Sequence, residues 1–235
     1  MKLVILAGGY GTRMSEETKK KPKPLVEIGD MPIIWHLMKI YSYYGINDFI
    51  ICLGYKGNLL KKKISQINKK ERWKINYVNT GLNTMTGGRI KRIKKFLKDD
   101  KIFCLSYGDG LSDVNILKLI NYHKSKGKIA TLTAVKQFNR FGVLEIKNNH
   151  LVKKIKEKPK NYINGGFFIL SKKIFKYLKN DETIFEKDCL PRISKINQLA
   201  AFKHDGFWAC MDNLREKKEL NRIWKSKKIA WKVWK

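Results

Sequence analysis

The chain has 235 residues and a formal net charge of +31, with 51 Lys and Arg against 20 Asp and Glu. This length suits one α/β domain with a substantial core, and no apolar run approaches the roughly 18 residues of a membrane span. The charge raises nucleic acid as a partner, but only eight of the basic residues are arginines, the preferred bidentate readers of phosphates and base edges. The lysines are spread along the chain, so we interpret them as a general bias and expect no specific nucleic-acid partner and no membrane partner.

The four cysteines show no metal-binding or disulfide pattern. Cys52, Cys104, Cys189 and Cys210 lack any Cys-x-x-Cys spacing, so we interpret them as ordinary reduced thiols. Met1 leads directly into an apolar strand, without the basic and then long apolar stretch of a secretory signal. We therefore expect a cytoplasmic protein.

Strand-like and helix-like segments alternate along the first half of the chain. Short apolar runs predict buried strands, and apolar residues spaced by three or four predict amphipathic helices. The predicted strands are 3–7, 49–53, 75–78 and 102–107, and the predicted helices are 32–44, 59–67, 88–97 and one that begins near 113. This alternation favours an α/β fold with a largely parallel sheet and helices on its faces.

The pattern changes after residue 128. Predicted strands at 129–135, 143–146, 151–156 and 163–170 follow one another with shorter connections. Residues 225–235 carry Trp231 and Trp234, and we expect this tail to dock either on the body of the protein or on a neighbouring subunit.

A glycine-rich, basic loop follows the first predicted strand. Its glycines, within residues 8–13, let the backbone approach a ligand closely and aim N–H groups at an anion, while Arg13 adds a planar fork of donors. Lys23 stands between two prolines that stiffen its loop. The pattern predicts a polyphosphate site. It is not a dinucleotide fingerprint, because Met14 occupies the last glycine position, nor a P-loop. The alternative is an ordinary glycine-rich turn with basic residues nearby.

Two carboxylates stand where predicted strands end. Asp109 follows strand 102–107, and Asp212 follows a strand-like run at 207–211. Ligands of α/β sheets sit beyond the carboxyl ends of the strands, and two carboxylates that converge on a triphosphate suit Mg²⁺. The alternative is that Asp109 forms an Asp-Gly turn and Asp212 caps a helix near residue 214.

Strings along almost the whole chain resemble the sugar-1-phosphate nucleotidyltransferase family. The glycine loop with Lys23 is similar to the family's nucleotide loop, and Asp109 and Asp212 are similar to its two metal ligands. The strings similar to its acceptor pocket are Phe141-Gly142, Glu157-Lys158-Pro159 and Asn164-Gly165-Gly166-Phe167-Phe168. The strings that resemble its glucose-1-phosphate cytidylyltransferase branch are Ser15-Glu16-Glu17-Thr18, Ile34-Trp35-His36, Gly54-Tyr55-Lys56-Gly57 and Met85-Thr86-Gly87-Gly88-Arg89-Ile90-Lys91-Arg92.

The resemblance implies a fold and a reaction. The fold is a Rossmann-like, mixed but mostly parallel sheet flanked by helices, GT-A-like, in a single domain over 1–235. Residues 1–128 would form its nucleotide-binding half, and residues 129–235 its acceptor-binding half with a C-terminal helix. In the implied reaction, a phosphate oxygen of the acceptor attacks the α-phosphorus of CTP and pyrophosphate leaves, through positioning and electrostatic stabilisation without a covalent intermediate. The favoured acceptor is glucose-1-phosphate, which gives CDP-glucose for surface or capsule polysaccharide.

The resemblance also implies residue roles. Arg13 would hold the β- and γ-phosphates, Lys23 the α-phosphate, and Asp109 with Asp212 a Mg²⁺ ion, which makes Arg13, Lys23 and Asp109 the implied catalytic residues. The implied nucleotide-binding residues are Leu6, Ala7, Gly8, Gly9, Gly11, Thr12, Arg13, Lys23, Thr84, Gly87, Gly88, Arg89, Gly108 and Asp109. The implied acceptor-binding residues are Gly142, Glu157, Lys158, Asn164 and Gly165.

Departures from the family leave alternatives open. Relatives carry a longer segment between residues 57 and 80 that builds subunit contacts, so we expect a homo-oligomer whose assembly differs. Segments 135–141 and 158–162, which flank the acceptor pocket, match incompletely. The acceptor is therefore open between glucose-1-phosphate, another sugar-1-phosphate and a non-sugar such as phosphorylated glutamine. Glu157 and Lys158 also fit an exposed ion pair. A basic nucleic-acid-binding protein on this fold is the remaining alternative, against which the intact Arg13 and Lys23 argue.

Overall fold

The computed structural model describes the whole chain except residues 139–141, 158–159 and 235. Its centre is a seven-stranded sheet in the order β12-β8-β11-β6-β1-β4-β5. β11 runs antiparallel to both of its neighbours, and the other adjacent strands pair in parallel. This mixed, mostly parallel sheet confirms the predicted fold class. The strands are β1 (Leu3–Leu6), β4 (Asp48–Leu53), β5 (Lys74–Asn79), β6 (Ile102–Tyr107), β8 (Ala130–Phe138), β11 (Lys160–Ser171) and β12 (Leu199–His204).

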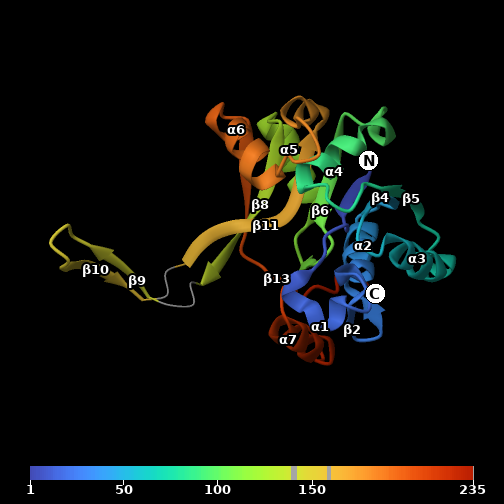
Figure 1. Cartoon of the computed structure of the whole chain (residues 1–235), viewed down its shortest axis with the longest axis horizontal. Helices are drawn as coiled ribbons and strands as arrows, with labels where there is room; N and C mark the ends of the chain where they lie inside the picture. The colour runs from blue at the N-terminus through green and yellow to red at the C-terminus, as the bar shows by residue number, and fades with distance from the viewer. Residues whose placement is uncertain (139–141, 158–159, 235) are drawn as a thin grey trace.

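Helices flank the sheet, as Figure 1 shows. The α-helices are α1 (Ser15–Thr18), α2 (Ile33–Tyr43), α3 (Gly57–Glu71), α4 (Thr86–Arg92), α5 (Ile116–Lys126), α6 (Leu190–Lys195) and α7 (Leu214–Trp224). Short 3₁₀ turns are η1 (Thr12–Met14), η2 (Lys23–Leu25), η3 (Lys94–Leu97) and η4 (Lys172–Tyr177), and a π-helical turn is η5 (Phe185–Cys189). Over the described residues, no helix is both long and apolar enough to cross a bilayer.

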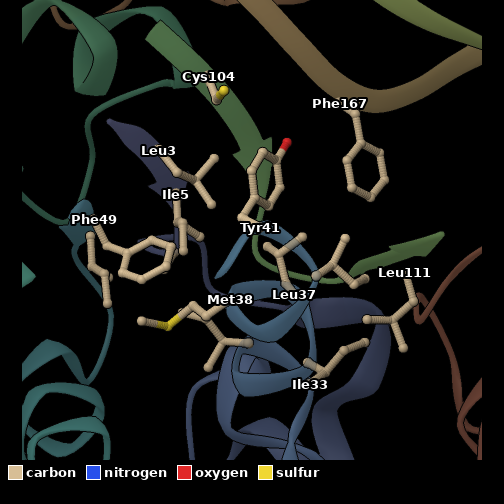
Figure 2. Close-up of a cluster of buried hydrophobic side chains, with 14 of the residues drawn as sticks. Leu3, Ile5, Ile33, Leu37, Met38, Tyr41, Phe49, Cys104, Leu111 and Phe167 are labelled. Carbon is tan, nitrogen blue, oxygen red and sulfur yellow. The ribbon is translucent and has the colours of Figure 1, made fainter. Parts of the chain in front are cut away.

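The core consists of two clusters, and successive side chains of β1 belong to one cluster and then to the other. Leu3 and Ile5 belong to the cluster that includes α2, whereas Val4 and Leu6 belong to the cluster that includes Ile90 of α4. This alternation follows from the period of two in a strand, which sends successive side chains to opposite faces. Figure 2 shows part of the first cluster, with side chains of β1 and α2 gathered between the sheet and the helix. Because both faces are covered, β1 reads as a continuous apolar run.

Three predicted helices differ from the structure by two residues or more at an end, and the helix predicted at 59–67 is the longer α3. The predicted helix 88–97 is divided into α4 and the 3₁₀ turn η3, although its apolar positions Ile90, Ile93 and Leu97 are fully buried as expected. The helix expected near 113 begins only at Ile116, because the side chain of Asn115 accepts a hydrogen bond from the backbone N–H of Lys118 at 2.9 Å and caps it there.

Short strands complete the structure. β2 (Glu27–Ile28) pairs with β3 (Met31–Pro32), and β7 (Gly110–Ser112) pairs with β13 (Trp208–Cys210). β9 (Val143–Ile146) and β10 (Val152–Lys156) form an antiparallel hairpin that projects away from the body in Figure 1.

The C-terminal tail docks on the body of its own chain, one of the two expected outcomes. Trp231 is fully buried and its ring lies near those of His36, Phe207 and Trp224. This packing gives Trp231 an apolar environment, although the segment around it is rich in lysine.

Candidate active site

A pocket of about 1000 Å³ opens at the carboxyl ends of β1 and β6. It brings together most of the residues that sequence analysis assigned to a site. The assigned residues that line it are Leu6, Ala7, Gly8, Gly9, Gly11, Thr12, Arg13, Lys23, Thr84, Arg89, Gly108, Asp109, Asn164, Gly165 and Asp212. Gly87, Gly88, Gly142 and Glu157 lie outside the lining, and Lys158 falls outside the described residues.

The glycine loop turns tightly against its neighbours. A side chain at Gly8 would place its Cβ 2.1 Å from Nη1 of Arg89, so glycine is required for the close approach. The carbonyl of Gly8 accepts hydrogen bonds from Arg89 and from the backbone N–H of Tyr55, both at 3.1 Å. At Gly11, φ is +66°, a left-handed conformation that starts the turn carrying Arg13. These contacts fix the loop along the wall of the pocket.

Lys23 lies between two carboxylates. Its ammonium donates to Oδ2 of Asp109 and, at 2.6 Å, to Oδ1 of Asp212. Arg13 donates to the other oxygen of Asp212 at 2.5 Å. Burial alone would lower the pKa of Lys23, but the two carboxylates outweigh burial and raise it. Burial would raise the pKa of Asp212, but Lys23 and then Arg13 outweigh it and lower that pKa. Lys23 and Asp212 are therefore both charged at neutral pH.

The pairing of β7 with β13 brings the two carboxylates together. The backbone N–H of Met211 donates to the carbonyl of Asp109 at 3.0 Å, next to the pair formed by Gly110 and Cys210. The alternative that Asp212 caps the following helix is wrong, because Asn213 caps α7 by accepting from the N–H of Glu216 at 3.0 Å.

Arg89 is a buried arginine that joins three loops. Its Nη1 donates to the carbonyls of Leu53 and Gly81 and to the hydroxyl of Thr80, at 3.2, 2.7 and 2.7 Å. Its Nη2 donates to the carbonyls of Gly8 and Leu82, each at 3.1 Å. These acceptors lie at the last residue of β4 and in the loops that follow β1 and β5. Arg89 lines the pocket, where we expected its guanidinium to lie near a triphosphate. In the structure these N–H groups donate to the protein's own backbone and to Thr80 instead, and so fix the loops.

Comparison with known proteins identifies the family. A family model described as nucleotidyl transferase matches residues 2–226. The chain belongs to the nucleotidyl transferase family. It is therefore a nucleotidyltransferase, an enzyme of phosphorus-group transfer.

Curated relatives and solved structures agree with this identification. Glucose-1-phosphate cytidylyltransferase of Salmonella typhimurium is 45% identical over 257 aligned positions, which cover 100% of both chains. The probable glucose-1-phosphate cytidylyltransferase of Bacillus subtilis is 42% identical over 256 positions, again covering 100% of both. HddC from Yersinia pseudotuberculosis, of known crystal structure, is 28% identical with a TM-score of 0.76 and coverage of 95% of this chain and 99% of HddC.

The two cytidylyltransferases are longer in places than this nucleotidyltransferase. Their alignments span 257 and 256 positions, more than the 235 residues of the chain, so both relatives carry residues that it lacks. Extra residues in relatives are what sequence analysis expected between residues 57 and 80, where the structure has α3 and β5.

The two aspartates of the nucleotidyltransferase fit a Mg²⁺ site. Over the described residues, no group of three or more His, Cys, Asp or Glu side chains could hold a metal ion. Mg²⁺, however, needs only one or two protein carboxylates and completes its shell with phosphate and water oxygens. Asp109 and Asp212 already contact one shared cation, the ammonium of Lys23, so they converge on a single positive charge.

Gly87 and Gly88 serve packing beneath the pocket. A Cβ at Gly88 would lie 2.6 Å from the backbone of Asp181, and a Cβ at Gly87 would lie 2.7 Å from the carbonyl of Thr183. The N–H of Gly87 donates to that same carbonyl at 2.9 Å. These glycines therefore let the start of α4 press against the segment that precedes η5.

The wall of the pocket that we expected to bind the acceptor is built from β11 and β13. Oδ1 of Asn164 accepts from the N–H of Gly166 at 2.9 Å, and the carbonyl of Gly165 accepts from Nε1 of Trp208 at 2.7 Å. Trp208 thus helps to fix this wall of the pocket. Gly142 and Glu157 lie together at the base of the β9–β10 hairpin, where a Cβ at Gly142 would be 3.0 Å from Oε2 of Glu157.

Several residues that line this pocket were assigned to no site by sequence analysis, among them Tyr107 and Glu186. Tyr107 directly precedes the assigned Gly108 and Asp109, so its neighbours could have indicated it. Glu186 stands in a stretch without a motif, and only the folded chain brings it to the site.

Proposed function

We propose that the protein transfers CMP from CTP to glucose-1-phosphate, with release of pyrophosphate and formation of CDP-glucose. One observation carries this choice of substrates, namely 45% identity over the full length to a glucose-1-phosphate cytidylyltransferase. The mannose-1-phosphate guanyltransferase of Aspergillus oryzae is only 31% identical and is matched over 60% of its length. CDP-glucose would supply surface or capsule polysaccharide.

The pocket provides the charges that this reaction needs. The nucleophile is a phosphate oxygen that is already ionised at neutral pH, so no general base is required. None of the four histidines of the chain lines the pocket that the described residues form. Arg13 and Lys23 would bind the triphosphate oxygens and stabilise the charge that develops on them. Asp109 and Asp212 would hold Mg²⁺, which neutralises charge on the phosphates when bound.

The acceptor would lie on the β11 side of the pocket. Asn164, Gly165 and Trp208 shape this wall. Glu157, with Gly142 beside it, would reach the acceptor from the base of the hairpin, and Lys158 would hold the acceptor's phosphate. These contacts would place the phosphate oxygen in line with the leaving pyrophosphate.

We also propose a homo-oligomer in which the β9–β10 hairpin meets a second copy of this chain. Leu144 pairs with Ile155 and Ile146 pairs with Val152, so these four side chains share one face of the hairpin and are 49–65% exposed. An isolated two-stranded hairpin is marginally stable in water, so this face needs a cover. It carries no charge, which lets two copies of a chain with net charge +31 meet there without opposing lysines.

We propose a single domain and a cytoplasmic location. Both halves of the chain, 1–128 and 129–235, contribute strands to the seven-stranded sheet, which supports one domain. All four cysteines are free thiols, which suits the reducing cytoplasm where CTP is available.

The test is Mg²⁺-dependent release of pyrophosphate from CTP, UTP, dTTP, ATP and GTP, each with a panel of phosphorylated acceptors. We expect release with CTP and glucose-1-phosphate. Turnover of CTP with another sugar-1-phosphate or with phosphorylated glutamine would keep the mechanism and replace the acceptor. Absence of release with every pair, combined with salt-sensitive binding of nucleic acid, would overturn the proposal in favour of a nucleic-acid-binding protein.

A further inference from the structure

Glu186 is a pocket-lining carboxylate held by two hydroxyl groups. The phenol of Tyr107 donates to its Oε1 at 2.5 Å, and the hydroxyl of Thr86 donates to its Oε2 at 2.7 Å. The oxygen of Thr86 also accepts from the backbone N–H of Phe185 at 2.9 Å. One side chain of η5 is thereby fixed to the end of β6 and to the first residue of α4.

Tyr107 also contacts the strand that forms the proposed acceptor side of the pocket. Its ring packs against Gly166 and lies edge-on to Phe168. Glu186 is thus connected through Tyr107 to β11, the strand that also carries Asn164 and Gly165 of the proposed acceptor wall.

The carboxylate of Glu186 has capacity left for a ligand. An ionised carboxylate offers about four acceptor positions, and the two hydroxyl groups occupy two of them. The described residues form no ion pair with Glu186, so its charge is not neutralised by a lysine or arginine there. A bare negative charge repels a triphosphate but attracts neutral O–H and N–H donors. The ligand group that suits Glu186 is therefore a hydroxyl or an amino group.

We propose that Glu186 determines acceptor specificity by accepting a hydrogen bond from one ring hydroxyl of the sugar phosphate, with Tyr107 and Thr86 fixing its orientation. The proposal rests on the proposed function, because it assumes a polyhydroxylated acceptor. The hydroxyl is favoured over a base amino group because Tyr107 joins Glu186 to β11, the strand that carries Asn164 and Gly165 of the proposed acceptor wall. A site built to hydrogen-bond a hydroxyl rejects analogues that lack it.

The test compares wild-type protein with Glu186→Gln, which keeps the size of the side chain and removes its charge. We expect KM for glucose-1-phosphate to rise about 10- to 100-fold, the scale for a lost hydrogen bond to a charged group, with KM for CTP nearly unchanged. Glu182→Gln is the matched control, since Glu182 is exposed on the same segment and does not line the pocket. Tyr107→Phe keeps the charge of Glu186, loosens its orientation, and should give a smaller rise.

Deoxy analogues of glucose-1-phosphate separate a direct contact from a general loosening of the pocket. For wild-type protein, KM for one of the 2-, 3-, 4- or 6-deoxy compounds should exceed KM for glucose-1-phosphate by about the same factor. Glu186→Gln should show no further rise in KM with that compound. Equal losses in both proteins, or a rise confined to KM for CTP, would overturn the proposal; the latter result would assign Glu186 to the base. If wild-type protein uses another acceptor, the proposed function fails, and the same comparison with that acceptor decides the role of Glu186. Calorimetric titration that shows equal acceptor affinity in both proteins, or none in wild type, would also overturn it.

Discussion

The ammonium of Lys23 lies 2.6 Å from Oδ1 of Asp212 and also donates to Asp109. The lysine comes from the loop after β1, and the carboxylates follow β6 and β13, so the fold joins three distant parts of the chain at one charge. The Lys23 side chain is 14% exposed and lines the pocket, where its ammonium is held in place before any ligand arrives. Such preorganised charge is what stabilises a phosphoryl transition state most effectively.

We predict that Lys23→Ala lowers turnover about 10²-fold or more, the scale for losing a preorganised charge contact. Pyrophosphate release under saturating substrates measures the effect. Lys21→Ala is the matched control, because Lys21 lies on the same loop, pairs with Glu17 and Glu27 at 3.8 and 3.5 Å, and does not line the pocket. Near-normal turnover of a folded Lys23→Ala protein would remove Lys23 from the mechanism.

Our second prediction concerns the contribution of Arg89 to the free energy of unfolding. Arg89→Met would leave several buried carbonyls without a donor, and each unsatisfied group costs about 1–3 kcal/mol, so we expect a loss of at least about 3 kcal/mol in the free energy of unfolding. Arg92→Met, on the same helix, removes only an exposed ion pair with Asp181 and should cost at most about 1 kcal/mol. Urea unfolding of both variants makes the comparison, and equal losses would contradict the buried role of Arg89.

His36 is buried in its neutral form. Its Nε2 lies 2.9 Å from the carbonyl of Ile28, to which it donates, and its Nδ1 accepts from Nε1 of Trp231 at 3.5 Å. Burial lowers the pKa of His36 to about 4, and the hydrogen bond to Ile28 offsets this only in part. A proton on Nδ1 would place two N–H groups against each other, so protonation opposes docking of the C-terminal tail.

We therefore predict an acid-sensitive stability. The folded pKa of about 4 lies below the unfolded pKa of about 6.5, so the unfolded state binds the proton first. The contribution of His36 is constant above about pH 6.5, and the protein loses stability as pH falls toward 4, by about 2 kcal/mol at pH 5. Urea unfolding between pH 5 and 7.5 should show a flatter profile for His36→Gln than for wild type. The exposed His150, changed to Asn, should leave the profile as it is in wild type; an unchanged profile in His36→Gln would contradict the prediction.

The local sequence was enough to predict those strands whose positions depend on burial of apolar side chains. The predicted strands 49–53 and 102–107 agree with β4 and β6 to within one residue, because continuous apolar runs mark strands covered on both faces. The convergence of Asp109 and Asp212 also followed from sequence, since both stand at carboxyl ends of strands. Each strand, and the carboxylate that follows it, is marked by residues next to one another in the chain.

Long-range contacts account for what sequence could not predict. The helix α4 starts at Thr86 instead of 88, because the N–H groups of Met85 and Gly87 donate to carbonyls of Asp181 and Thr183 at 2.8 and 2.9 Å. The loop-binding role of Arg89 and the placement of Glu186 depend in the same way on partners that no local pattern specifies.

The buried Trp231 lies beyond residue 226, where the match to the family model ends. We predict that Trp231→Ala lowers the free energy of unfolding by about 3–5 kcal/mol, the usual cost of removing a buried aromatic side chain. Trp234→Ala is the control, since Trp234 is only partly buried at the edge of the same cluster, and it should cost less. Thermal unfolding measures both, and equal costs would contradict the anchoring role of Trp231.

Substitutions on the two faces of the β9–β10 hairpin test the proposed assembly. Val152 lies on the aliphatic face and Val143 on the opposite face, where it pairs with Lys156, and the two valines are 49% and 45% exposed. A lysine in the centre of an apolar contact would have to be buried without a partner, so Val152→Lys should dissociate the oligomer, whereas Val143→Lys should leave it intact. Sedimentation velocity at micromolar concentration measures both. A monomeric wild-type protein, or equal dissociation by both variants, would show that this face is not where two copies meet.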